Sequence, residues 1–245
     1  MVLRALVLQH AACEPPGAYE EVLRAQGWSL ERCELDEGER LPEAPGFDAL
    51  IVMGGPMSAN DEAELPWLGP EKRLIAGYVA DEVPVWGVCL GAQLLAASLG
   101  APVFAGPEPE VGLCEVSLTD AAREDPVFGA APAVLGTLQW HGDTFELPAG
   151  ATLLAQSPLY PNQAFRVGAL AYGLQFHLEA SPEMAARWLE LPAYREALER
   201  ALGPGSAEAV LEELSAASEE MLGAAGALFS RWLALASARA SLATQ

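Results

Sequence analysis

The chain has 245 residues, of which 51% are hydrophobic, and its 34 acidic and 13 basic side chains give a formal net charge of −21. The length and the hydrophobic content suit one large α/β domain, alone or with an appendage, and exclude a disordered chain. Phosphate groups are bound by clustered Lys and Arg, so the acidic balance argues against nucleic acid or an anionic membrane as a partner.

Export and membrane insertion are not indicated by the sequence. Residues 1–10 are apolar but too short for a signal peptide, and no apolar run is expected to reach the length of a membrane span. Cys13, Cys33, Cys89 and Cys114 are too few for a disulfide framework, and no CxxC pair indicates zinc. We therefore expect a cytoplasmic protein that uses no metal ion and no organic cofactor.

The first hundred residues alternate apolar runs with helical patterns. Strands are predicted at 4–10, 28–35, 47–55 and 83–89. Helices are predicted at 18–27, 71–82 and 90–100, and glycine ends the first and the last of them. Strands that alternate with helices at this spacing indicate βαβ units and a mainly parallel sheet.

The later part of the chain changes character twice. Residues 101–180 read as short strands joined by turns, which is typical of antiparallel hairpins. From Ser181 onwards the pattern is helical, with Ser181 as N-cap and Pro182 at the first helical position. After a break at 202–206, apolar residues recur three, four or seven apart, as in an amphipathic helix. This helix either packs on its own domain or docks on a partner or a second copy.

Cys89 stands at the join between a predicted strand and a predicted helix. The run Gly87-Val88-Cys89-Leu90-Gly91 is the thiol form of the G-x-S-x-G elbow, a sharp turn that needs small flanking residues and projects the nucleophile from the sheet edge. The N-terminus of the following helix stabilises the thiolate, which is the reactive form. A cysteine is more commonly a small buried hydrophobe, but this spacing favours a nucleophile.

A thiol nucleophile requires a base, and the chain has three histidines, His10, His141 and His177. Only His177 has a carboxylate two residues on, at Glu179. In an extended segment these two residues share a face, so the carboxylate can fix the tautomer of the ring. A lone H-x-E is a weak signal, but beside the elbow it favours a triad of Cys89, His177 and Glu179.

An acyl carbon attacked by a thiolate develops an oxyanion, which needs hydrogen-bond donors. The N–H of Leu90, directly after the nucleophile, is one candidate. Gly54 and Gly55, where the 47–55 strand ends, are the other, because glycine lets a backbone N–H face the substrate. By itself this Gly-Gly-Pro segment is equally typical of an ordinary turn.

Four segments together resemble a known family. "VMGGPMS", "VPVWGVCLGAQLLA", "WHGDTF" and "YGLQFHLE", in this order, are similar to a class I (triad) glutamine amidotransferase domain, especially to the glutaminase part of GMP synthase and its stand-alone relatives. The likeness spans residues 3 to 185 approximately. It implies a flavodoxin-like, mainly parallel sheet with helices on both faces and an added antiparallel strand region. We expect this domain at 1–182, with a helical C-terminal extension at 183–245 packed on it.

The resemblance also implies roles for individual residues. Cys89, His177 and Glu179 match the family's triad, while Gly55 and Leu90 match its oxyanion hole. Other residues match those that bind the glutamine substrate in the family. Gln93 matches a residue that helps to hold glutamine, and the turn at Gly142 and Asp143 matches a segment whose backbone binds the amino-acid end of glutamine. His141 is then expected to be a loop residue of the site and not the base. Leu178 stands where the family usually has proline.

Three functions are compatible with these features. The first is hydrolysis of glutamine to glutamate and ammonia, with the ammonia passed to a separate synthase subunit, since no synthetase domain accompanies the motifs. The second is hydrolysis of a γ-glutamyl amide or peptide by a free-standing enzyme. The third is a catalytically silent regulatory subunit that docks through its C-terminal helix, although a silent site has no need of an intact triad.

Overall fold

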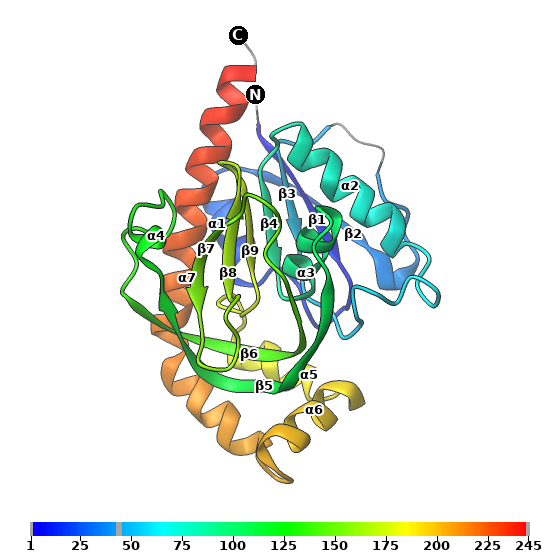
Figure 1. The fold of residues 1–245 in the computed structure, drawn as a ribbon, viewed down its shortest axis with the longest axis vertical. Coiled ribbons are helices and arrows are strands. Elements are labelled where there is room, and N and C mark those ends of the chain that lie inside the picture. Colours follow the sequence, from blue (N-terminus) through cyan, green and yellow to red (C-terminus); the bar gives the residue numbers. More distant parts are fainter. Residues whose placement is uncertain (1, 43–45, 244–245) are drawn as a thin grey trace.

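The computed structural model describes residues 2–42 and 46–243, and a nine-stranded sheet runs through this part of the chain (Figure 1). The strands are β1 (Arg4–Gln9), β2 (Ser29–Glu34), β3 (Ala49–Val52), β4 (Val85–Val88), β5 (Val103–Leu118), β6 (Val134–Phe145), β7 (Thr152–Gln156), β8 (Ala164–Val167) and β9 (Ala171–Leu174). The helical segments are α1 (Ala18–Ala25), the 3-10 turn η1 (Leu35–Glu37), α2 (Leu68–Ala80), α3 (Leu90–Ser98), α4 (Asp120–Arg123), α5 (Pro182–Trp188), α6 (Pro192–Leu202) and α7 (Ala207–Ala243).

The sheet combines a parallel half with an antiparallel half. Its strand order is β2-β1-β3-β4-β9-β8-β7-β5-β6. Strands β2, β1, β3, β4 and β9 pair in parallel, in the order typical of flavodoxin-like folds. From β9 to β6 each neighbouring pair is antiparallel. The predicted architecture, with helices on both faces, an added antiparallel region and a C-terminal helical extension, is confirmed.

Alternating side chains of the parallel strands pack into two separate hydrophobic layers, one on each face of the sheet. In β1, Ala5 and Val7 point into the layer that contains residues of α1 and α7, whereas Leu6 and Leu8 point into the layer with α2 and α3. Both sets are apolar because helices cover both faces of a parallel sheet, and this explains why the strand reads as a continuous apolar run. Figure 1 shows α2 and α7 lying on opposite sides of the sheet.

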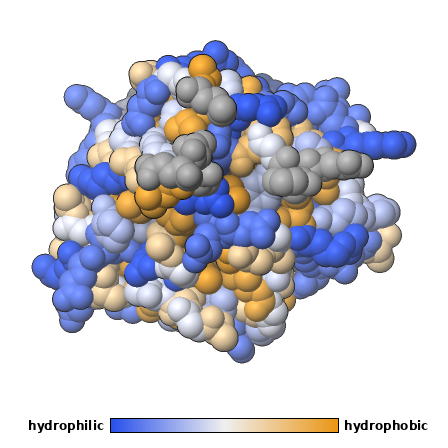
Figure 2. Space-filling model, turned by 90° about the horizontal axis from the view of Figure 1, so that it is seen from above, coloured by the Kyte–Doolittle hydropathy of each residue, from blue (hydrophilic) through white to orange (hydrophobic). Residues whose placement is uncertain are grey.

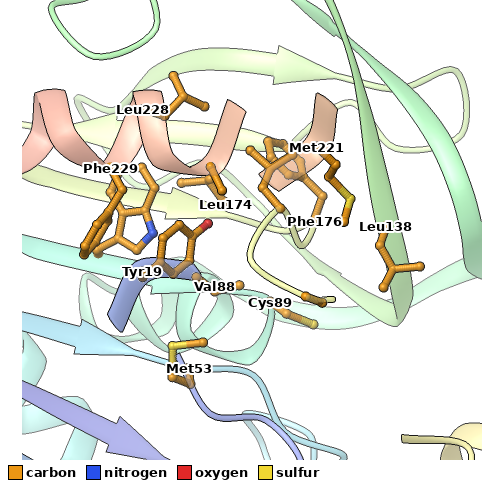
Figure 3. Packing of buried hydrophobic residues seen from close by; sticks show 14 of the residues in the cluster. Tyr19, Met53, Val88, Cys89, Leu138, Leu174, Phe176, Met221, Leu228 and Phe229 are labelled. Atoms are coloured by element: carbon orange, nitrogen blue, oxygen red, sulfur yellow. The ribbon is translucent and has the colours of Figure 1, made fainter. Parts of the chain in front are cut away.

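Helix α7 is bound to the sheet by a cluster of aromatic rings. Phe229 lies 4.6 Å from the ring of Tyr19, and Trp232 lies 5.5 Å from Trp86 of β4, measured between ring centroids. Tyr19 and Phe229 are seen in this cluster in Figure 3. The apolar stripe that the sequence predicts on this helix therefore packs on the helix's own sheet.

Helix α7 differs in one respect from what the sequence predicts. Its residues Ala207–Leu242 are long and apolar enough to cross a membrane by length and composition alone, contrary to our expectation for any segment. Its aromatic side chains are nevertheless fully buried in the protein core. At the end of the molecule where α7 finishes, hydrophilic residues are interspersed with hydrophobic ones, as on an ordinary globular surface (Figure 2). These features are those of a core helix.

The β5–β6 ribbon is a second difference. The sequence predicts short strands joined by turns, but β5 and β6 form one long antiparallel pair. The register shifts between Ala105 and Glu110, where the Gly- and Pro-containing stretch of β5 bulges while β6 continues opposite it. A bulge bends a ribbon without ending it, so Gly142 and Asp143 lie inside β6 and not in the predicted turn.

Replacing Trp232 by alanine tests the contribution of α7 to the core. Trp232 is fully buried and its Nε1–H donates to the Leu170 carbonyl at 3.0 Å. We expect Trp232→Ala to lower the free energy of unfolding by about 3 to 5 kcal/mol, measured by denaturant titration. Leu242→Ala, at a position on the same helix that is 72% exposed, should change it by less than about 0.5 kcal/mol. Equal effects of the two substitutions would contradict this packing.

Candidate active site

The residues singled out in the sequence meet at one edge of the sheet. His10 follows β1, Gly54 follows β3, Cys89 follows β4, and His177 follows β9. Parallel strands end at the same edge, which is where ligands bind in open α/β sheets. A cavity of about 320 Å³ lies here, walled by the ends of β3 and β4, by β6 and by α6.

Cys89 occupies a strained turn between β4 and α3. Its φ of 50° and ψ of −106° lie outside the regions that a side chain normally allows, and its N–H donates to the Leu174 carbonyl at 2.8 Å. A Cβ on Gly91 would collide with the Val52 carbonyl, and one on Gly87 would lie 2.5 Å from the Gly91 oxygen. The two flanking glycines are therefore required by packing. Cys89 belongs to the hydrophobic cluster and lies next to Val88 (Figure 3).

His177 and Glu179 form a buried pair beside this cysteine. The Nδ1 atom of His177 is 2.7 Å from Oε1 of Glu179, and both side chains are at most 2% exposed. The backbone of His177 is held in place by two hydrogen bonds with Leu138 of β6, of 2.8 and 3.0 Å. Leu178 donates its N–H to Oε2 of Glu179 at 3.0 Å. A proline at this position has no such N–H, so this departure from the family pattern adds a hydrogen bond to the carboxylate.

The environment of His177 favours its charged form. Burial alone lowers the pKa of an imidazole, but the charge of Glu179 and hydrogen bonds with Cys89 and Glu179 outweigh burial, and the pKa of His177 is raised well above its usual value. These neighbours thus stabilise the imidazolium form of His177. The imidazolium places a positive charge next to the Cys89 sulfur, and the first turn of α3 adds the partial charge of its free N–H groups.

The two expected oxyanion donors border the same cavity. Gly55 and Leu90 both line it, and neither N–H donates a hydrogen bond to any residue in the described ranges 2–42 and 46–243. A Cβ on Gly55 would lie 2.5 Å from Sδ of Met57 and 2.9 Å from Cβ of His10. The close approach of these groups, and not turn geometry alone, requires glycine at position 55.

Gln93 is held by other protein groups. Its Nε2 donates to the Asp143 carbonyl at 3.2 Å and to Oε1 of Gln175 at 3.1 Å, while Nε2 of Gln175 lies 3.6 Å from Sγ of Cys89. Gln93 thus connects α3 to β6 at the edge of the cavity, which Gly142 and Asp143 also line. Gln175 is absent from the sequence-based site, although it precedes His177 by two residues and the alternation of an extended segment places both on one face.

His141 lies in a strand, so its predicted place in a loop is wrong. It belongs to β6, where it pairs with Glu110 of β5. Its Nδ1 is 2.9 Å from the Asp143 carbonyl and its Nε2 is 3.2 Å from Oε2 of Glu110. With both ring nitrogens engaged, His141 supports the wall of the cavity.

Helix α6 supplies a wall that the sequence does not predict. Tyr194 of α6 lines the cavity, and its hydroxyl donates to Oε1 of Glu14. Glu14 is buried, and its Oε2 and Cε1 of His177 both crowd the space where a Cβ of Gly54 would sit. Glu14 and Tyr194 are 180 residues apart, and neither lies in a recognisable motif, so only the fold could reveal this pair.

Burial changes the titration of Glu14. The pKa of Glu14 is raised to about 7: loss of solvation raises it most, the charge of Glu179 also raises it, and charges on His177 and His10 act to lower it. Among residues 2–42 and 46–243, no three His, Cys, Asp or Glu side chains are grouped as they would be to hold a metal ion.

Comparison with known proteins identifies similar chains. A family model described as "Glutamine amidotransferase class-I" matches residues 20–191. The chain is 35% identical over 185 residues to the glutamine amidotransferase-like protein YfeJ of Salmonella typhimurium, covering 74% of this chain and 77% of that protein. It is 34% identical over 134 residues to one subunit of the glutamine-hydrolyzing GMP synthase of Thermococcus kodakarensis, covering 54% and 66%. The crystal structure of a glutamine amidotransferase from Thermotoga maritima superposes with a TM-score of 0.84 at 34% identity, covering 95% and 98%.

Two glycine-to-alanine substitutions, one at the elbow and one in an exposed part of a helix, test whether close packing requires glycine at the elbow. We expect Gly91→Ala to lower the free energy of unfolding by about 3 kcal/mol, because the new Cβ would press on the Val52 backbone. The matched substitution Gly77→Ala, in an exposed part of α2 with nothing within 4 Å, should raise it by about 0.5 to 1 kcal/mol. Denaturant titration of both variants measures this, and a Gly91→Ala protein of unchanged stability would contradict the elbow geometry.

The raised pKa of Glu14 predicts a pH dependence of stability. Between its ordinary value of 4.5 and about 7, the folded protein binds more protons than the unfolded chain, so the contribution of Glu14 to stability falls as pH rises. Glu14→Gln removes this effect. The unfolding free energy of the variant minus that of the unsubstituted protein should increase by about 2 to 3 kcal/mol as the pH rises from 5 to 8. A difference that stays constant over this range would refute the assignment.

Proposed function

The chain belongs to the class I glutamine amidotransferase family, and we propose that it hydrolyses the side-chain amide of glutamine through Cys89, His177 and Glu179. The observation that supports this most directly is the buried His177–Glu179 pair, with its 2.7 Å hydrogen bond, beside a cysteine in a strained elbow. A nucleophile, an acid/base and a group that orients the base are the parts that acyl transfer to a thiol requires.

In the proposed acylation step, the Cys89 thiolate attacks the carboxamide carbon of glutamine. The carbonyl oxygen becomes an oxyanion, which accepts hydrogen bonds from the N–H groups of Gly55 and Leu90. The tetrahedral intermediate collapses as the protonated His177 gives its proton to the nitrogen that leaves as ammonia. A γ-glutamyl thioester on Cys89 and a neutral His177 remain.

In the deacylation step, neutral His177 takes a proton from water as the oxygen attacks the thioester carbon. A second oxyanion forms in the same place, and its collapse releases glutamate and restores the Cys89 thiolate and the imidazolium of His177. Glu179 keeps the ring oriented through both steps and stabilises its charged form. The raised pKa of His177 suits the resting state of this cycle.

The amino-acid end of glutamine is proposed to lie along β6. Gly142 and Asp143 line the cavity there, and Gln93 fixes the Asp143 carbonyl from the side of α3. The Asp143 carboxylate also accepts a hydrogen bond from Oγ of Ser58 at 2.7 Å, which limits its freedom. Groups held in this way can orient the substrate so that its amide lies at Cys89.

We further propose that the ammonia passes to a synthase on a separate polypeptide. The support is the similarity to a relative that is named as one subunit of a GMP synthase, a name that implies a further polypeptide. Ammonia transfer requires docking, and the net charge of −21 suits a partner with a basic surface.

A free-standing γ-glutamyl amide hydrolase is the second candidate. The observation that favours it is the wall formed by α6 of the same chain, in which Glu196 and Arg200 border the cavity beside Cys89. A cavity of about 320 Å³ with polar groups on this wall has room for a leaving group larger than ammonia. A silent regulatory subunit has no observation in its favour that equals the buried His177–Glu179 pair beside Cys89.

Cys89→Ala tests the reaction. We expect ammonia and glutamate release from glutamine to fall by about 10⁴-fold or more, because the variant cannot form the thioester. Cys114→Ala, which removes a half-buried thiol from β5, should keep its activity. Both variants are measured beside the unsubstituted protein.

The outcomes separate the candidates. Glutamine hydrolysis that persists in Cys89→Ala would refute the proposed mechanism. Cleavage of γ-glutamyl amines much faster than glutamine, and lost in the same variant, would establish the second candidate. A protein that turns over neither substrate but retains a stable partner would be a silent subunit.

A further inference from the structure

A buried ion pair lies directly behind the Gly54–Gly55 peptide. His10, the residue after β1, and Glu71 of α2 have fully buried side chains, and Nε2 of His10 is 2.8 Å from Oε1 of Glu71. The ring of Trp67 stacks on His10 with centroids 5.6 Å apart. The proposed reaction assigns no step to either member of this pair.

The partners of His10 determine where its protons are. Its Nδ1 lies 3.1 Å from the carbonyl oxygen of Gly54, which can only accept, so Nδ1 must carry a hydrogen. On the other side of the ring, Nε2 lies 2.8 Å from Oε1 of Glu71, and it carries a hydrogen when Glu71 is ionised. Burial acts to lower the pKa of His10, but the charge and hydrogen bond of Glu71, the Gly54 carbonyl and the charge of Glu14 outweigh it and the pKa is raised.

The hydrogen bond to Gly54 also controls the N–H of the next residue. The C=O of Gly54 and the N–H of Gly55 belong to one planar trans peptide, in which the two groups point in opposite directions. With the carbonyl turned towards His10, the N–H is turned away from it, and Gly55 borders the cavity together with Cys89. Two adjacent glycines offer little resistance to rotation of this peptide, so an external group has to hold it.

We propose that His10, held by Glu71, is a positioning residue that keeps the Gly55 N–H aimed at the oxyanion formed on attack by Cys89. The inference rests on the proposed function, because no oxyanion forms without attack on an acyl carbon. Donors that are aimed in advance stabilise the transition state without reorganising during the reaction.

A purely structural role for the pair explains less. Burying two charges carries a large desolvation cost, and an apolar pair of similar volume would join β1 to α2 at least as stably. An apolar ring at position 10, however, could not donate to the Gly54 carbonyl. The need for a hydrogen-bond donor at the Gly54 carbonyl explains why position 10 is a histidine. The need to pair this buried histidine explains why Glu71 lies beside it.

Substitution of His10 by asparagine or by glutamine tests the roles of its two ring nitrogens one at a time. In His10→Asn the side-chain amide takes the place of Nδ1 and keeps a donor for Gly54, whereas in His10→Gln it reaches the place of Nε2 and keeps only the Glu71 partner. We expect kcat for glutamine to fall by about 10²-fold in His10→Gln with KM changed by less than about threefold, because the lost interaction exists only in the transition state. His10→Asn should stay within about tenfold of the unsubstituted kcat.

A variant elsewhere controls for the loss of a buried ion pair. Arg166→Gln removes the cation that lies 2.7 Å from the buried carboxylate of Asp125, and we expect it to lower stability without changing kcat. Equal losses of kcat in His10→Gln and His10→Asn, or a kcat loss of similar size in Arg166→Gln, would overturn the positioning role.

Alkylation of Cys89 by iodoacetamide measures the reactivity of the thiol in a reaction that forms no oxyanion. Displacement of iodide occurs at a saturated carbon, so His10→Gln should be alkylated at the unsubstituted rate, measured by mass spectrometry of the peptide containing Cys89. A slower rate would mean that His10 acts on the thiol instead, which would overturn the inference.

The inference can fail separately from the proposed function. Absence of glutamine hydrolysis by the unsubstituted protein would refute the proposed function alone. Crystal structures of the two variants then decide whether His10 holds the Gly54–Gly55 peptide, without any activity measurement. We expect the Gly54–Gly55 peptide to be rotated in His10→Gln and retained in His10→Asn, and a retained peptide in both variants would overturn the role of His10.

Discussion

Parallel pairing of β1, β3, β4 and β9 is the constraint on which the site depends. Because these strands run in one direction, the segments after them all emerge at one edge. His10, Gly54, Cys89 and His177 come from four separate parts of the chain and reach the same edge of the sheet for this reason. The register of the strands then fixes how far each segment projects, so the alignment of the site follows from the hydrogen bonds of the sheet.

Several buried titratable groups lie at this edge of the sheet, and the neighbours of each group shift its pKa for different reasons. His177 and His10 each face a carboxylate that raises the pKa of the ring, whereas Glu14 is kept largely by desolvation at a pKa of about 7. Two imidazoles that favour their charged form and a carboxyl that favours its neutral form thus lie within one small region, and shifted pKa values of this kind cluster at functional sites. Their burial is a cost to stability that the aromatic core has to offset.

The C-terminal extension contributes at two distant places. Helix α7 packs Trp232 against Trp86 of β4, the strand that leads into the elbow, while α6 brings Tyr194, which lines the cavity, to Glu14. One stretch of chain therefore supports the back of the sheet and encloses its functional edge. A change in the extension can alter the cavity without touching Cys89, His177 or Glu179.

The sequence by itself determined the alternating elements, the elbow around Cys89 and the pairing of His177 with Glu179. These features depend on residues that are neighbours in the chain: small glycines that permit a sharp turn, apolar periodicity, and two side chains on one face of an extended segment. Only the tertiary structure decided that β6 continues through Gly142 and Asp143, and that His10 meets Glu71, 61 residues away. The physical reason is that buried polar groups find their partners through packing of the whole chain, which no local pattern encodes.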